Sequence, residues 1–384
     1  MPIPLDGIGL GVAGNSSTEY GYILNLHNEK QGAKIPLVKV LEILKNFFQE
    51  VFKQGLGQSP KVLSSGQRPE VLKKEQSMKN ILVVGSINMD YVIHTERLPK
   101  LGETITGSDF AMNFGGKGAN QATATAKLGC PTKMLGAVGD DLAGGLARKN
   151  LEGYGVDCTP VATTNAPTGA AVITVCGGDN HIILDIGANG RITPDAIRAQ
   201  ESLFDWADAV ILQYEIPTES VLEAAKLAKA HGCRVLLNPA PVKEVDPALY
   251  GYVDLVVPNE FEASLLTGMT VKDRESAVPA LRKLQEMGCK AALITLGKQG
   301  CAYINEQNEI AYAGIYEIKV VDTTAAGDSF IGGLCSMLCE GKTMREAVRY
   351  ATAVSTLAVS RAGAGVSIPT ADEVETFLAE RGDL

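Results

Sequence analysis

From residue 78 onward, apolar runs of strand length alternate with segments of helical period. The apolar runs include residues 81–84, 209–212, 234–237, 255–257 and 291–296. The helical segments between them include residues 121–128, 220–230, 277–287 and 329–340. Continuously apolar strands separated by helices are typical of a parallel sheet that is covered on both faces. The pattern therefore predicts an α/β fold with a central, mostly parallel sheet and helices on both of its faces.

Two stretches break this rhythm. Residues 90–114 and 169–186 alternate apolar and polar side chains, as in the run Gly-Ala-Ala-Val-Ile-Thr-Val over residues 169–175. Such alternation is typical of half-exposed antiparallel strands. We expect these stretches to form a small antiparallel β sheet that lies beside the main sheet and covers a site as a lid.

The first 77 residues differ in character from the rest. Residues 36–54 place apolar side chains at three- and four-residue steps, which predicts one amphipathic helix. Residues 55–77 are rich in Gly, Ser, Gln and Lys and are typical of a linker. We therefore predict an extension over residues 1–77 that is otherwise poorly ordered, followed by a main domain over residues 78–384.

Composition and charge argue against several classes of function. The 35 basic and 44 acidic residues give a net charge of −9, which argues against a nucleic-acid or anionic-membrane binder. No apolar run approaches the roughly 18 residues that cross a bilayer. The eight cysteines form no Cys-x-x-Cys pair and the four histidines are scattered, so neither a zinc site nor a disulfide framework is expected. No secretory signal is apparent, and we expect a cytoplasmic protein.

A glycine-rich segment, Gly-Gly-Lys-Gly-Ala-Asn-Gln over residues 115–121, lies between a predicted strand and a helix. Glycines let a ligand approach the backbone closely, and Asn120 can make two directed hydrogen bonds to a diol. The segment lacks the glycine spacing and the Ser or Thr of a P-loop. A sugar-binding turn and an ordinary strand-to-helix turn both remain open for this segment alone.

Small residues surround Asp328 at the start of the predicted helix 329–340, in the run Asp-Thr-Thr-Ala-Ala-Gly-Asp-Ser-Phe over residues 322–330. Small side chains leave backbone N–H groups uncovered, and together with the helix dipole these make an anion site. A carboxylate beside a bound phosphate would repel it unless the carboxylate acts as a general base for an attacking hydroxyl. The alternative is a helix-capping aspartate.

Polar side chains follow several of the predicted strands. Asn88 and Asp90 come after the first strand and could hold a polyol, and Glu215 follows residues 209–212 in the same way. Ligands of open α/β sheets bind at the carboxyl ends of the strands, so these side chains are expected to meet.

Two further strand ends carry candidates for a nucleotide site. Asn259 and Glu262 follow residues 255–257 and, three residues apart on a helix, could order a hydrated Mg²⁺. A solvated acidic helix start is the alternative. The turn over residues 295–300 could carry the phosphates or the ribose of a nucleotide.

Together these motifs resemble those of the ribokinase-like (PfkB) carbohydrate kinases, in order and in spacing, over residues 78 to about 382. The segments that carry the resemblance are residues 85–90, 115–121, 258–262, 295–300 and 322–328. The ribokinase branch of the family is favoured by residues 115–121 and by the tail over residues 358–369.

The resemblance implies a fold and an activity. It implies a ribokinase-like fold and ATP-dependent phosphorylation of D-ribose to D-ribose 5-phosphate, with Asp328 as the general base. The amides of Ala325, Ala326 and Gly327 would form the anion hole.

The resemblance also implies which residues bind each substrate. The residues that would hold the sugar, with Asp328, are Asn88, Asp90, Gly116, Lys117, Gly118, Asn120 and Glu215. The residues that would line the ATP site are Asn259, Thr295, Leu296, Gly297, Lys298, Gln299, Gly300, Gly327 and Thr352.

Metal ions and a second subunit are implied in the same way. Glu262 would position Mg²⁺ through water. A monovalent activator, normally K⁺, would be held partly by main-chain carbonyls, at Asp322, Thr324, Ala358, Arg361, Gly363 and Ser367. Lids of this family often pair two subunits, so a homodimer is expected.

Some features depart from the family pattern or leave alternatives open. Residues 1–77 have no counterpart in the family, and Thr352 stands where a base-stacking or amide side chain is expected. The acceptor could instead be deoxyribose, fructose or another hexose, or a nucleoside. A non-catalytic sugar-binding regulator on the same scaffold would be expected to have a damaged base, whereas Asp328 is present.

Overall fold

The computed structural model describes residues 79–177 and 179–383. The helix predicted over residues 36–54 and the linker over residues 55–77 lie outside the described residues. In the described part, no helix is both long enough and apolar enough to span a bilayer.

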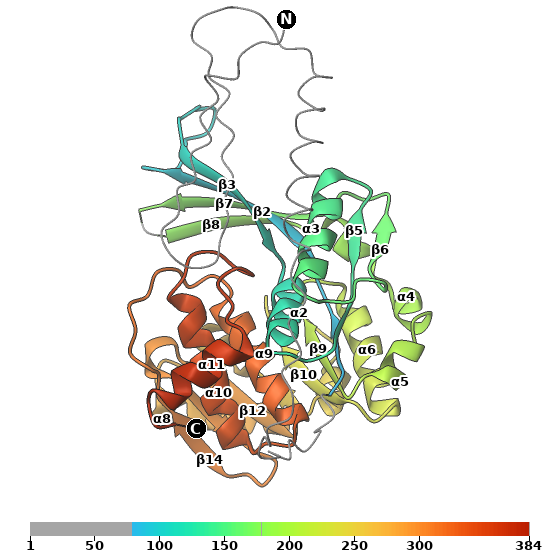
Figure 1. The fold of residues 1–384 in the computed structure, drawn as a ribbon, viewed down its shortest axis with the longest axis vertical. Helices are drawn as coiled ribbons and strands as arrows, with labels where there is room; N and C mark the ends of the chain where they lie inside the picture. The colour runs from blue at the N-terminus through green and yellow to red at the C-terminus, as the bar shows by residue number, and fades with distance from the viewer. Residues whose placement is uncertain (1–78, 178, 384) are drawn as a thin grey trace, which may run out of the picture. The chain divides into compact units, whose positions relative to one another are not determined.

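The core of the domain is an eight-stranded sheet with the order β14-β13-β12-β11-β10-β9-β1-β4 (Figure 1). Six neighbouring strands are parallel: β4 (Thr132–Leu135), β1 (Ile81–Val84), β9 (Ala209–Gln213), β10 (Arg234–Asn238), β11 (Leu255–Val256) and β12 (Ala291–Thr295). β13 (Cys301–Ile304) and β14 (Ile310–Ala313) extend one edge in antiparallel pairing. The prediction of a mostly parallel central sheet is confirmed.

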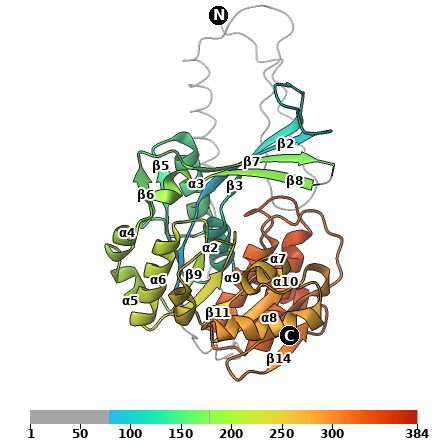
Figure 2. The same cartoon turned by 180° about the vertical axis from the view of Figure 1, so that it is seen from behind.

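Helices cover both faces of this sheet, as Figures 1 and 2 show from opposite sides. Leu82 and Val84 belong to one core cluster, and Ile81 and Val83 belong to the other, because successive strand residues point to opposite faces. The first face is covered by α4 (Pro194–Arg198), α5 (Ser202–Trp206), α6 (Thr218–Ala230), α7 (Glu260–Thr267) and α8 (Arg274–Glu286). The second is covered by α2 (Lys117–Lys127), α3 (Leu142–Gly153), α9 (Ala326–Cys339) and α10 (Met344–Val359).

Smaller elements complete the domain. α11 (Ala371–Ala379) packs against α10 in a third apolar cluster. β5 (Ala137–Gly139) and β6 (Ala162–Thr164) form a short parallel pair. Short 3₁₀ helices lie at η1 (Gly187–Arg191), η2 (Pro247–Tyr252) and η3 (Gly297–Gln299).

A second sheet of four strands, which we call the lid, projects from the end of the domain that holds the carboxyl ends of the parallel strands (Figure 1). Its order is β3 (Ser108–Gly115), β2 (Asn88–Thr95), β7 (Gly169–Cys176), β8 (Asp179–Asp185). The two outer pairs are antiparallel as predicted, but the central pair β2 and β7 is parallel. Parallel pairing is possible here because a long crossover, which includes α2 and α3, returns the chain to the same end before β7 begins.

Candidate active site

A cavity of about 230 Å³ lies where the parallel strands end and α2, α7 and α9 begin. It is lined by Lys117, Asn238, Val257, Asn259, Glu262, Thr295, Thr323, Ala325, Ala326, Gly327, Asp328 and Ile331. Residues from segments more than 200 positions apart therefore meet at one edge of the sheet. Asn259, Thr295, Gly327 and Asp328, expected in one site from the sequence, line the same cavity.

The start of α9 presents backbone N–H groups to this cavity. Ala325 is the N-cap residue, and its φ of 59° is left-handed, a conformation that costs an L-residue about 1–2 kcal/mol. The Ala326 N–H donates to Thr323 O at 3.2 Å, whereas the N–H groups of Ala325 and Gly327 have no protein acceptor in the described part of the chain. Ala325, Ala326 and Gly327 line the cavity, and a Cβ on Gly327 would meet no atom outside its own helix within 4 Å, so open space adjoins this turn. The arrangement can bind an anion.

Asp328 is held by α2 rather than by the start of its own helix. Its Oδ2 accepts a hydrogen bond from Asn120 Nδ2 at 3.0 Å, and its Oδ1 accepts one from Gln121 Nε2 at 2.9 Å. The residue is only 7% exposed, and no side chain caps α9. The capping alternative does not describe this carboxylate, which is instead oriented toward the anion-binding cavity.

Lys117 brings positive charge to the same cavity. Burial alone would lower the pKa of its ammonium group, but the carboxylates of Asp328, Glu215 and Glu262 together raise the pKa above its usual value. Lys117 therefore stays charged and can bind an anionic ligand. From the sequence we expected this residue to hold the sugar, and the structure places its side chain beside the anion-binding amides.

The sugar-side residues gather around Glu215, which follows β9. Its Oε2 accepts hydrogen bonds from Ser86 Oγ at 2.5 Å and from the Lys117 N–H at 3.0 Å. Asn88 Nδ2 lies 3.5 Å from the same oxygen, and its Oδ1 accepts from Asn189 Nδ2 at 2.8 Å. Glu215 thereby links the Lys117 N–H at the start of α2 to the Ser86 hydroxyl, which lies just after β1.

Asp90 lies two residue pairs further along the lid than Asn88, with its side chain against Gly115. A Cβ on Gly115 would lie 2.1 Å from Asp90 Oδ2, so a larger residue there would displace the Asp90 side chain. Burial, together with the charges of Glu215 and Asp328, raises the pKa of Asp90 to about 7. A carboxylate with such poor solvation gains from ligand hydroxyl groups that donate to it.

A second, much smaller cavity of about 10 Å³ adjoins these residues. Its lining includes Asn88, Gly115, Asn120 and, from the far loop, Gly365. Gly116, the N-cap of α2, has a φ of 93°, which favours glycine, and Gly118 is buried against Ser86. The predicted sugar residues are therefore neighbours in space, at the base of the lid.

The predicted nucleotide residues are only partly brought together. Asn259 caps α7 and forms a capping box with Glu262: Glu262 N donates to Asn259 Oδ1 and Asn259 N donates to Glu262 Oε2, both at 2.8 Å. Burial raises the pKa of Glu262, against the lowering effects of the Asn259 N–H and Lys117. The second oxygen of Glu262, Oε1, is free of the capping box and can hold a water of a hydrated Mg²⁺.

The turn after β12 is more exposed. Gly297, Lys298 and Gln299 form η3 between the buried Leu296 and Gly300, whose φ is 84°. The Gln299 side chain donates to Lys272 O at 2.9 Å. Thr352 is 8% exposed and its hydroxyl donates to Val348 O at 2.8 Å, so it serves its own helix and does not line the cavity.

The residues expected to hold K⁺ lie around Asp322. Its Oδ2 accepts from Gly363 N at 2.9 Å, and its Oδ1 accepts from Thr324 N and Thr324 Oγ1 at 2.8 and 2.6 Å. Partial burial would raise the pKa of Asp322, but these hydrogen bonds hold it below its usual value. Ala358 lies in the last turn of α10, and the Ser367 hydroxyl donates to Ala364 O at 2.8 Å.

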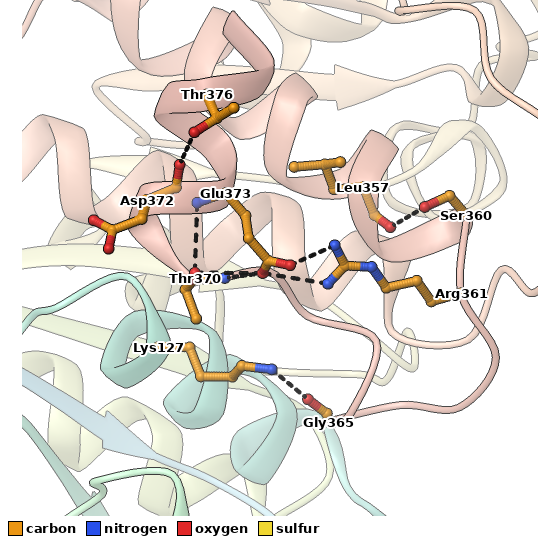
Figure 3. A network of polar contacts seen from close by, with 9 residues as sticks. All are labelled: Lys127, Leu357, Ser360, Arg361, Gly365, Thr370, Asp372, Glu373 and Thr376. Atoms are coloured by element: carbon orange, nitrogen blue, oxygen red, sulfur yellow. Dashed lines mark hydrogen bonds and ion pairs between the residues drawn. The ribbon is translucent and has the colours of Figure 1, made fainter. Parts of the chain in front are cut away.

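Figure 3 shows how the loop between α10 and α11 is fastened. The Arg361 guanidinium contacts Glu373 at 2.7 and 3.3 Å, and Lys127 Nζ of α2 donates to Gly365 O at 3.3 Å. Because its side chain is engaged by α11, Arg361 offers only its carbonyl to a cation. The carboxylate, hydroxyl and carbonyl oxygens of this loop fit a hard monovalent ion. Among the described residues, this loop included, no group of three or more His, Cys, Asp or Glu could hold a metal.

Sequence reasoning missed several polar residues of the site. Ser86, Asn189, Gln213 and Asn238 are buried, and Gln121 contacts Asp328 directly. Asn238 directly follows the apolar run 234–237, and Gln213 directly follows the run 209–212, so this signal could have identified both. Nothing in the local sequence marks Asn189.

Comparison with known protein families identifies the class of protein to which this fold and this site belong. The model of the pfkB family carbohydrate kinases matches residues 78–371, and the chain belongs to this family. Ribokinase of Haemophilus influenzae is 37% identical over 302 residues, which are 78% of this chain and 98% of the relative. The structure of Arabidopsis thaliana ribokinase complexed with ribose and ATP is 36% identical, with a TM-score of 0.74 over 78% of this chain and 98% of that one. A deoxyribokinase of Salmonella typhi is 34% identical over 304 residues, which are 78% of this chain and 99% of the relative.

Proposed function

We propose that this protein is a ribokinase that transfers the γ-phosphoryl group of ATP to the 5-hydroxyl of D-ribose. The observation that carries the proposal is the position of Asp328. Its buried carboxylate lines the same cavity as the open N–H groups of α9 and the ammonium group of Lys117. The cavity thus pairs a proton acceptor with an anion-binding site, which phosphoryl transfer to an alcohol requires.

The reaction follows from this pairing. The 5-hydroxyl oxygen forms a bond to the γ-phosphorus, the bond from that phosphorus to the bridging oxygen breaks, and ADP leaves. The hydroxyl proton passes to the Asp328 carboxylate. The amides of Ala325, Ala326 and Gly327, with Lys117, stabilise the charge on the transferring group. The Ala326 N–H would exchange its bond to Thr323 O for one to the phosphoryl group.

The sugar is proposed to bind at the base of the lid, where Asn88, Asp90, Asn120 and Glu215 converge. The raised pKa of Asp90 supports this role, since a poorly solvated carboxylate gains most from hydroxyl donors. Gly116 and Gly118 bring the α2 backbone close to the ligand.

ATP is proposed to bind beside Asn259, Thr295 and the turn of residues 296–300. Magnesium would neutralise phosphate charge, and Glu262 would hold its hydration shell. Potassium would add positive charge next to the anion site through the Asp322 loop. The cytoplasmic location and the requirement for these two ions stay predictions.

Deoxyribose is the strongest alternative acceptor, because a deoxyribokinase is among the relatives. A nucleoside is less well supported, because the relatives reported above are ribokinases and a deoxyribokinase. A non-catalytic regulator is not favoured, because Asp328 and the open amides are both intact.

A homodimer formed through the lid is also proposed. Met112, Val172 and Ile183 are 50%, 48% and 74% exposed. Tyr91 pairs with both Met112 and Val172, and Val172 pairs with Ile183, so these side chains form one row across the lid. Asp90 is adjacent to Tyr91 and points to the opposite face. An exposed apolar row on a sheet supports association with a second copy.

The experiment that tests the proposed function is an ATP-consumption assay with D-ribose, deoxyribose, fructose and adenosine, with and without K⁺. We expect the highest kcat/KM for D-ribose and stimulation by K⁺. Asp328→Ala should lower kcat by about 10²–10⁴ because a general base is lost, with ribose binding largely kept. Preference for another acceptor, or unchanged turnover in Asp328→Ala, would contradict the proposal.

A further inference from the structure

Three buried side-chain amides are linked to Asp328: those of Gln121 and Gln213, and that of Asn238, which lines the larger cavity. Gln213 is the last residue of β9, Asn238 is the last residue of β10, and Gln121 lies in the first turns of α2. Gln213 and Gln121 are 0% exposed and Asn238 is 7% exposed. Neither glutamine lines the two cavities described above. Their effect on a substrate must therefore pass through another residue.

The hydrogen bonds fix the orientation of each amide. Asn238 Nδ2 donates to Val257 O at 3.1 Å, and a carbonyl can only accept, so Asn238 Oδ1 faces Gln121. Gln121 Nε2 donates to this oxygen at 3.3 Å and to Asp328 Oδ1 at 2.9 Å. Both hydrogens of the Gln121 amide are thereby directed to acceptors.

Gln213 secures the other end of the Gln121 amide. Its Nε2 donates to Gln121 Oε1 at 2.7 Å. If the Gln121 amide were flipped, its NH₂ group would face the Gln213 donor and its oxygen would face the Asp328 carboxylate. Gln213 therefore selects the orientation in which Gln121 donates to Asp328.

Stability alone does not explain this arrangement. Gln213 Oε1 is buried and has no hydrogen-bond partner among the described residues, which costs about 1–3 kcal/mol. The side chain also requires a glycine at position 85, where a Cβ would lie 1.9 Å from Gln213 Oε1. An apolar side chain of the same shape would avoid the unpaired acceptor, so the donor of Gln213 has a use beyond packing.

We propose that Gln121 and Gln213 are positioning residues for phosphoryl transfer, which fix the carboxylate of Asp328 in the orientation that accepts the hydroxyl proton. The inference rests on the proposed role of Asp328 as the base. Gln121 holds one carboxylate oxygen and Asn120 holds the other, from the same helix. With both oxygens fixed, the carboxylate cannot rotate toward the ammonium group of Lys117, which lines the same cavity.

The test uses side chains of similar shape that cannot donate. Gln213→Met and Gln121→Met should lower kcat about 10- to 100-fold, since a small misplacement of a reacting group costs rates of this size. The dissociation constant for ribose, measured by calorimetry, should change less than about threefold. Thr125→Val is the matched control, because Thr125 is a buried polar residue of α2 whose hydroxyl donates to Gln121 O and Ala122 O but does not contact Asp328. It should keep the wild-type kcat.

A double-mutant cycle separates positioning from a general loss of structure. Combined with Asp328→Asn, Gln213→Met should cause no further loss of kcat, because the carboxylate that it positions is gone. An equal loss in both backgrounds, or a wild-type kcat in Gln213→Met, would overturn the inference. Unchanged turnover in Asp328→Asn alone would instead show that the proposed base is wrong. Should Gln213→Met fail to fold, Gln213→Leu supplies the same comparison, because its apolar side chain cannot donate either.

Discussion

At the scale of the residue, the surroundings of Asp90 destabilise its charged form. Burial and the neighbouring carboxylates of Glu215 and Asp328 raise its pKa to about 7. Because the pKa in the folded protein lies above the usual value of 3.8, the unfolded chain releases this proton first as pH rises. The stability of the free protein is therefore reduced progressively between about pH 4 and pH 7, and the full cost is present above pH 7.

Replacement of Asp90 by Asn should stabilise the free protein and weaken ribose binding. Asp90→Asn should raise the midpoint of thermal unfolding by about 2 °C or more at pH 8, and by less at pH 5, where the wild-type carboxyl group is largely protonated. The affinity for ribose should fall about 10-fold or more as charge-assisted hydrogen bonds are lost. Thermal scans at the two pH values and calorimetry measure both effects.

Asp109→Asn is the control, because Asp109 is an exposed carboxylate on the same lid. It should show neither effect. In the wild type, ribose affinity should fall as pH drops through 7 and Asp90 takes up a proton. A constant affinity from pH 6 to pH 8 would contradict the assigned role of Asp90.

Sequence reasoning identified the residues that stand next to a recognisable local pattern. Asp328 was found from the small residues around it, and Asn120 from its glycine-rich segment. Gln121 lies in the same segment, but its contact with Asp328 joins residues 207 positions apart. Gln213 ends an apolar strand and has no motif around it. Local sequence carries no signal for a contact that only the packing of α2 on the sheet creates.

At the scale of the element, α9 serves both binding and packing. Its first turn faces the cavity, and its later turns pack against α2 and α10 in the core. Two glycines of α9 show which part of the helix borders open space and which part is closely packed. A Cβ on Gly327 would meet nothing within 4 Å, whereas a Cβ on Gly332 would lie 2.4 Å from the Cβ of Ala124.

Alanine at these two positions should separate activity from stability. Gly327→Ala should keep or slightly raise the thermal midpoint, since alanine favours helix, and should lower kcat about 10-fold or more because its methyl group obstructs the proposed anion site. Gly332→Ala should instead destabilise the fold by about 1–3 kcal/mol through overpacking, while the protein that remains folded keeps its kcat. Denaturant unfolding and steady-state kinetics measure the two effects.

Full activity in Gly327→Ala would show that the phosphoryl group does not approach this turn. A loss of stability there comparable to that of Gly332→Ala would show that the space before Gly327 is not open.

The lid strands show where element prediction stops. Alternation of polar and apolar residues identified residues 90–114 and 169–186 as strands, but it predicted only antiparallel pairs. The parallel pairing of β2 with β7 depends on where the chain re-enters the lid after α3. The segment that connects β2 to β7, and not the sequence of either strand, therefore determines that they pair in parallel.

At the scale of the whole molecule, the lid carries an exposed apolar row on the face opposite Asp90. If two copies associate through Met112, Val172 and Ile183, a charge in this row should prevent it. Ile183→Asp should convert a dimer into a monomer, because burying an unpaired carboxylate in an interface is costly. Sedimentation velocity measures the change.

Asn180→Asp, which adds a charge at an exposed polar position of the same strand, should leave the dimer intact. A wild-type protein that sediments as a monomer at micromolar concentration would contradict the proposed dimer.

The sequence by itself determined the α/β class, the sheet covered on both faces, the presence of a lid and the family. These features follow from periodicity and from motifs a few residues long, which neighbouring residues specify together. Tertiary structure alone decided that α2 holds Asp328, that Gln213 orients Gln121, and that Thr352 serves its helix rather than the cavity. The physical reason is that hydrogen bonds and burial depend on which distant segments meet, and that is settled only when the helices pack on the sheet.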